Sequence, residues 1–174
     1  RSIDYCCIEE DNIRASRALR LLAAKAGIGG MIGGQTADIE AEGQENPVTE
    51  EQLLFIHEHK TAALIQAAMM TGGILAGASD SELAKLEKCA YNVGIAFQIQ
   101  DDILDVVGDS QELGKTVGSD AENHKQTYVT LKGLKESGAQ AAALSGEAVR
   151  ILDGFSGEHA FLKQLILTLI NRRS

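Results

Sequence analysis

The segment that decides the fold reads Phe97-Gln98-Ile99-Gln100-Asp101-Asp102-Ile103-Leu104-Asp105-Val106-Val107-Gly108-Asp109. At about 3.6 residues per turn, its acidic side chains fall in one sector of a helix, and aliphatic side chains fill the rest. The acidic sector holds Gly94, Gln98, Asp101, Asp102, Asp105 and Asp109, and the aliphatic part holds Ile95, Ile99, Ile103, Val106 and Val107. A helix that is apolar over most of its circumference is expected to be buried. The acidic stripe should therefore face an interior cavity.

The acidic stripe predicts a site for a hard divalent cation. Two carboxylates about 6 Å apart repel by roughly 3 kcal/mol at an effective dielectric near 20, and a bound cation with oxygen ligands relieves that repulsion. A solvated acidic face is the usual alternative, but the neighbouring residues are too apolar for it and Asp is a poor helix former. An EF-hand calcium loop needs acids at alternate positions, whereas these acids are one helical turn apart.

The run from Phe97 to Asp109 resembles the second aspartate-rich motif of the trans-isoprenyl diphosphate synthases, most nearly the bacterial farnesyl and geranylgeranyl enzymes. Four further motifs follow the order and approximate spacing of that family: Gly33-Gly34-Gln35-x-x-Asp38, His59-Lys60-Thr61, Gly114-Lys115 and Asn123-His124-Lys125-x-x-Tyr128. Several linked motifs are more specific than a single DDxxD. The resemblance implies an all-α, isoprenoid-synthase-type helical bundle around a central cavity. It also implies a prenyltransferase that joins an allylic diphosphate to isopentenyl diphosphate, with a farnesyl or geranylgeranyl type of product.

The resemblance further implies a magnesium site on the acidic stripe. Its metal ligands would be Asp101, Asp102 and Asp105. Asp101 is the expected direct ligand, and Asp105 is expected to reach a metal-bound water, because Mg²⁺ usually keeps part of its water shell. Phe97 would supply apolar wall for the isoprenoid tail.

The same resemblance assigns the groups that would bind the diphosphate substrates. The substrate-binding set is Asp38, Lys60, Thr61, Gln98, Lys115 and Lys125, and the catalytic set is Asp101, Lys60 and Lys115. Without the resemblance, Lys60 reads as a solvated surface charge and Asp38, with Gln35, as a polar helix exit. His57 and His59 are expected on the polar face of their helix. Arg172 is read as a positive charge that complements a helix C-terminus.

Composition favours one all-α domain over residues 1–174. Pro occurs once and aromatic residues make up 4% of the chain, which is typical of a helical protein and not of a sheet. The net charge of −9 disfavours nucleic acid as a partner, because phosphate would be repelled. Three cysteines without a paired or metal-binding spacing, and the lack of a signal peptide or a long apolar span, favour a cytoplasmic protein. The resemblance suggests a homodimer.

The expected helices run over residues 3–26, 49–70, 79–107, 127–134, 139–152 and 158–170. Thr49 with Gln52, and Ser79 with Glu82, form predicted capping boxes. The glycine-dense stretch after Gly29 is a helix whose glycines would let another backbone or a ligand come close.

The motifs present match only the C-terminal portion of the family, since relatives carry another aspartate-rich motif upstream. The chain by itself is therefore expected to bind magnesium diphosphate weakly and to condense nothing. Three alternatives stay open: a non-catalytic helical partner of such a synthase, a terpene cyclase, and a di-iron bundle. The di-iron bundle would need Glu-x-x-His pairs, and the sequence has none.

Overall fold

The computed structural model describes residues 9–42, 47–107, 126–170 and 172. Every regular element in these ranges is helical, so the predicted all-α class is confirmed. The elements are α2 (Glu9–Ala26), α3 (Met31–Glu42), α4 (Glu50–Ile56), the π-helix η1 (His57–Ala62), α5 (Ala63–Leu75), α6 (Asp80–Val107), α9 (Tyr128–Lys132), α10 (Leu134–Asp153) and α11 (Ala160–Ile170). None of these helices combines the length and apolar character that a bilayer crossing requires.

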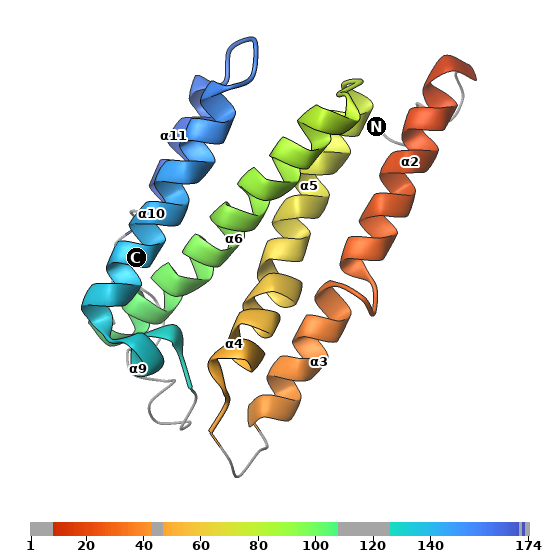
Figure 1. The fold of residues 1–174 in the computed structure, drawn as a ribbon. Helices are drawn as coiled ribbons and strands as arrows, with labels where there is room; N and C mark the ends of the chain where they lie inside the picture. The colour runs from red at the N-terminus through yellow and green to blue at the C-terminus, as the bar shows by residue number, and fades with distance from the viewer. Residues whose placement is uncertain (1–8, 43–46, 108–125, 171, 173–174) are drawn as a thin grey trace.

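Helix α6 is the central element of the bundle and has 28 residues. It packs against α5 on one side and α10 on the other (Figure 1). Helix α2 packs on α5 and α3 on η1, while α11 packs against both α10 and α6. Ile95, Ile99 and Ile103 of α6 are buried in the core, as the sequence predicted. Val106 and Val107 were also expected to be buried but are exposed, because they lie in the last turn of α6.

Both predicted capping boxes are present. The side chain of Thr49 accepts a hydrogen bond from the Gln52 N–H, and the Gln52 side chain accepts one from the Thr49 N–H. Ser79 and Glu82 exchange the same pair of bonds at the start of α6. Each pair satisfies N–H groups that have no partner inside the helix, and this fixes where α4 and α6 begin.

The predicted single helix over residues 49–70 is wrong in one respect, because η1 interrupts it. The Ala63 N–H bonds to the carbonyl oxygen of Glu58, five residues back. Glycines on two neighbouring helices let this segment come close. A Cβ added to Gly34 of α3 would lie 2.2 Å from the Lys60 nitrogen, and one added to Gly94 of α6 would lie 2.4 Å from the Ala62 Cα. The expected close approach of another backbone to the glycine-dense stretch is thus confirmed.

The C-terminal helices begin at different places from those predicted. Helix α9 ends at Lys132, and Gly133, with a φ of 81°, separates it from α10. Such a positive φ is one that glycine adopts without strain. Helix α10 then starts at Leu134, five residues before the expected Ala139, so that α9 and α10 form a bent pair along α6.

Candidate functional site

Asp101 lies at the surface of the bundle near the C-terminal end of α6. Its side chain is 41% exposed, and its Oδ1 lies 2.9 Å from Nη2 of Arg172. The same guanidinium group stands 4.0 Å above the Phe97 ring, a cation–π arrangement. Arg172 had been expected to complement a helix end. It instead brings positive charge directly onto the carboxylate predicted to bind a metal.

Asp102 has quite different surroundings from Asp101, since its side chain is only 6% exposed. Its Oδ2 accepts a hydrogen bond of 2.7 Å from the backbone N–H of Tyr128 and lies 3.9 Å from Nε2 of His57. Its Oδ1 accepts a 3.5 Å bond from Nε2 of Gln98. Asp102 therefore contacts three elements, η1, α6 and α9, from the inside of the bundle.

Asp105 is buried one turn further along α6. Within the described ranges, no three His, Cys, Asp or Glu side chains converge as a ligand set. Mg²⁺ does not need such a set, because it commonly binds through one or two carboxylates together with substrate phosphates and water. The carboxylate oxygens of Asp101 and Asp105 are the donor type that magnesium prefers, and one oxygen of Asp101 is occupied by the Arg172 guanidinium in this structure.

Lys60 and Asp38 form an ion pair, with 2.5 Å between Nζ and Oδ2. Asp38 is buried on α3, so it is not a solvated polar exit from that helix. Lys60 is partly buried in η1 and is not a freely solvated surface lysine. The contact joins the glycine-marked motif of α3 to the His-Lys-Thr motif of η1.

Thr61 connects η1 to the acidic stripe. Its hydroxyl donates a 3.0 Å hydrogen bond to Oε1 of Gln98, and Gln98 in turn reaches Asp102. The structure thus brings five predicted residues into one connected region: Asp38, Lys60, Thr61, Gln98 and Asp102. Lys115 and Lys125, which were predicted to approach the diphosphate, lie outside the described residues.

His57 is the main residue that sequence reasoning misplaced. It was expected on a polar face, but it is buried beside Asp102. The signal available in the sequence was its place one turn before Lys60, between the apolar Ile56 and the motif. The missing information was the change of helical register in η1.

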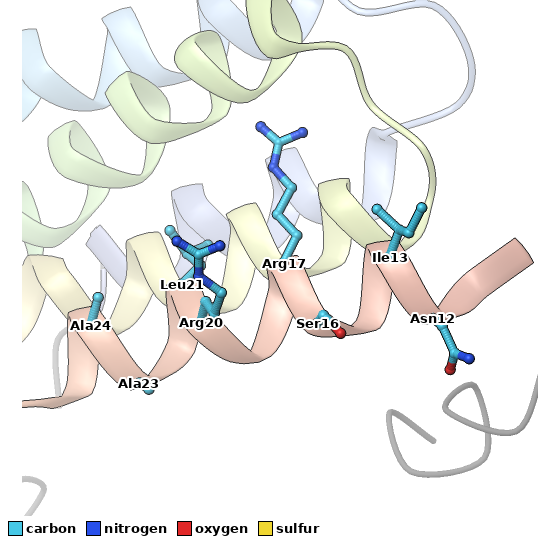
Figure 2. A pocket seen from close by; sticks show the side chains of 8 residues that line it. All are labelled: Asn12, Ile13, Ser16, Arg17, Arg20, Leu21, Ala23 and Ala24. Atoms are coloured by element: carbon cyan, nitrogen blue, oxygen red, sulfur yellow. The ribbon is translucent and has the colours of Figure 1, made fainter. Parts of the chain in front are cut away.

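A separate surface hollow lies elsewhere in the described region. It has a volume of about 1000 Å³ and lies along α2 (Figure 2). The residues that line it are Asn12, Ile13, Ser16, Arg17, Arg20, Leu21, Ala23 and Ala24, all from this one helix. It contains no predicted site residue, and Arg17 is already paired with Asp80. The hollow is therefore separate from the candidate site.

Comparison with known proteins gives consistent results. Residues 8–151 match the polyprenyl synthetase family. The chain is 40% identical to a dimethylallyltranstransferase of Fischerella ambigua (strain UTEX 1903), over 98% of this chain and 50% of that protein. It is 41% identical to the farnesyl diphosphate synthase of Bacillus subtilis (strain 168), over 89% of this chain and 53% of that protein.

Among solved structures, a geranyltransferase of Helicobacter pylori, complexed with magnesium and isoprenyl diphosphate, superimposes with a TM-score of 0.73. The sequence identity is 36%, over 91% of this chain and 51% of that one. The chain thus spans about half the length of the proteins it matches. Matched over most of its length and carrying the motifs around Asp38, Lys60 and Asp101, the chain belongs to the polyprenyl synthetase family.

Proposed function

We propose that the protein containing this chain is a magnesium-dependent prenyltransferase that condenses an allylic diphosphate with isopentenyl diphosphate. The product would be a short-chain isoprenyl diphosphate of the farnesyl or geranylgeranyl type. The observation that carries the proposal is the direct contact between Thr61 of η1 and Gln98 of α6. This contact places η1, which carries the Lys60 ammonium group and the Thr61 hydroxyl, beside the acidic stripe of α6. Such an arrangement suits a diphosphate whose oxygens face both a metal ion and protein donors.

In this proposal different residues of the chain bind the magnesium ion and the phosphate oxygens of the allylic diphosphate. Asp101, with Asp105 through water, would hold magnesium, which when bound offsets the charge of the departing diphosphate. Lys60 would place its ammonium group against phosphate oxygens as a point charge, and the Thr61 hydroxyl would donate a hydrogen bond. Both groups stabilise negative charge that grows as the carbon–oxygen bond of the allylic substrate breaks. Lys115 and Lys125 are proposed to bring their ammonium groups to the diphosphate as well.

We further propose that the protein acts in the cytoplasm and forms a homodimer. The 174-residue chain by itself binds magnesium diphosphate weakly and lacks turnover, because the acidic motif that relatives carry on the opposite wall is not in this sequence. Measurable condensation of dimethylallyl or geranyl diphosphate by the isolated chain would show the last statement to be wrong.

The decisive experiment is a calorimetric titration of the chain with pyrophosphate in the presence of Mg²⁺. Asp101→Asn and Lys60→Met should each weaken binding by about tenfold or more, because each removes one charge that contacts the ligand. Lys163→Met is the matched control, since Lys163 of α11 pairs with Asp153, the last residue of α10. Equal binding by all four proteins, or none by the unaltered chain, would favour a non-catalytic helical partner instead.

A further inference from the structure

We infer that Asp102 is a positioning residue that fastens η1 and α9 to α6, and that it is not a ligand of the metal. His57 is its counterpart in η1. The inference rests on the proposed function, because it concerns how the groups that bind the diphosphate are held in place. It assigns Asp101 and Asp102, which are adjacent and chemically identical, to separate tasks.

The first observation is the difference in surroundings between the two aspartates. Consecutive residues of an α-helix point about 100° apart, so they need not share an environment. The Asp101 side chain is 41% exposed and pairs with the side chain of Arg172. The Asp102 side chain is 6% exposed. A metal ion bound directly and shared with a diphosphate needs space beside its ligand for phosphate and water. Asp101 has that space, whereas the side chains of Asp102 and Asp105 are buried, so neither of these two is placed to bind the ion directly.

The second observation is that the protein itself engages both oxygens of Asp102. Oδ2 accepts the 2.7 Å hydrogen bond from the Tyr128 N–H, and Oδ1 accepts the 3.5 Å bond from Gln98. Tyr128 is the first residue of α9, where backbone N–H groups have no partner inside the helix. If the carboxylate turned toward a metal, this buried N–H would lose its acceptor, at a cost of about 1–3 kcal/mol.

The third observation links Asp102 to the proposed diphosphate-binding pair. His57 and Thr61 both lie in η1, on either side of Lys60 in sequence. Asp102 lies 3.9 Å from His57 Nε2 and reaches Thr61 through Gln98. One buried carboxylate thus lies beside η1 at His57 and is linked to it at Thr61 through Gln98, and together these two links orient η1 relative to the acidic stripe.

The two possible roles of Asp102 demand different properties. A metal ligand needs the negative charge, whereas a positioning residue needs an oxygen that accepts the Tyr128 N–H. Asp102→Asn has nearly the same shape, keeps one acceptor oxygen and loses the charge, while Asp102→Ala loses both. Asp101→Asn serves as the reference for loss of charge at the neighbouring position.

The test measures two quantities on the ¹⁵N-labelled chain: the affinity for pyrophosphate with Mg²⁺, and the hydrogen-exchange rate of the Tyr128 amide by NMR. Asp102→Asn should keep the affinity within about threefold and leave the amide protected, whereas Asp101→Asn should lose about tenfold in affinity with the amide unchanged. Asp102→Ala should expose the amide, with at least tenfold faster exchange, and weaken binding as well.

An Asp102→Asn variant that binds as poorly as Asp101→Asn while its Tyr128 amide stays protected would overturn the inference, because charge alone would then account for the role of Asp102. Should Asp102→Ala fail to fold, His57→Gln and His57→Leu provide a second comparison. Glutamine keeps a polar nitrogen near Asp102 and should restore binding that leucine loses, and equal binding by both would count against His57. The exchange rates report on the inference even if the unaltered chain binds no pyrophosphate, a result that would count against the proposed function alone.

Discussion

Arg172 and Asp101 are 71 residues apart in the chain, yet Nη2 of the first lies 2.9 Å from Oδ1 of the second. The carbonyl oxygen of Arg172 also accepts a 3.5 Å hydrogen bond from Gln100, so backbone and side chain are both held against α6. The C-terminal end of the described chain thus lies on the proposed metal ligand. A guanidinium group and a magnesium ion would compete for the same carboxylate.

Arg172→Gln should therefore raise the affinity of the chain for Mg²⁺, by about two- to fivefold, because this partly exposed ion pair is screened by solvent. Calorimetric titration with Mg²⁺ at low ionic strength measures the change. Arg150→Gln on α10 removes the same charge but leaves Asp101 untouched, since Arg150 bonds to the Gly146 carbonyl. A rise of the same size in both variants would mean that net charge, and not the Arg172 contact, is responsible.

The ion pair between Lys60 and the buried Asp38 should contribute to stability as well as to binding. Lys60→Met removes the cationic partner of a buried carboxylate and should lower the free energy of unfolding by about 1–3 kcal/mol. Adding Asp38→Asn to that variant should recover part of the loss, because the buried side chain at position 38 is then neutral. Urea denaturation of the two single variants and the double variant gives the coupling energy, and strictly additive effects would contradict a direct interaction.

Gly34 should tolerate no side chain, because its neighbour is backbone. Gly34→Ala would place a Cβ 2.2 Å from the Lys60 nitrogen, so it should destabilise the chain by more than about 2 kcal/mol and displace η1. Gly138→Ala is the matched control, since a Cβ there meets nothing within 4 Å. It should stabilise α10 by about 0.5–1 kcal/mol, the difference in helix propensity. Thermal unfolding of both variants would show opposite shifts in Tm, and parallel shifts would refute the close contact.

The buried Cys89 thiol should make the chain less stable at alkaline pH. Burial raises its pKa from 9.0 to about 11. Between these values the unfolded chain has lost the thiol proton and the folded chain has kept it, so stability should fall as the pH rises. The thiol contributes a loss of about 2–3 kcal/mol across this window.

Cys89→Ala should remove that part of the decline. A smaller decline should remain in the variant, because burial also raises the pKa of Tyr91 and Tyr128. Urea denaturation of both proteins between pH 8 and pH 11 provides the comparison. Identical pH dependence in the two proteins would show that the Cys89 thiol ionises normally.

Local sequence signals predicted the helices well. The capping boxes at Thr49 and Ser79 begin helices where expected, because both partners of each box lie within three residues. The periodicity of Ile95, Ile99 and Ile103 correctly placed the buried face of α6. These features depend on one helix at a time, and a single sequence contains all the information they need.

Features that depend on two or more elements were not available from periodicity. The register change in η1 follows from packing against Gly34 and Gly94, which are far from it in sequence. Without that change, His57 seemed to belong to a polar face. The surroundings of Asp102 likewise could not be distinguished from those of Asp101 by sequence, because only the placement of α9 shows that the Tyr128 N–H bonds to Asp102. The motifs identified the site residues, and the fold distinguished their surroundings.

The π-helical segment also limits how the chain can change in length. Each residue removed from a helix rotates everything before it by about 100° relative to everything after it. Deleting one residue from His57–Ala62 would let α4 and α5 merge into an unbroken α-helix, a locally favourable outcome. That rod would turn either Leu53 out of the core or Thr61 away from Gln98. The extra residue of η1 thus allows Leu53 to face the core and Thr61 to face Gln98 at the same time. Deletion of one residue there should therefore be far more damaging than a substitution.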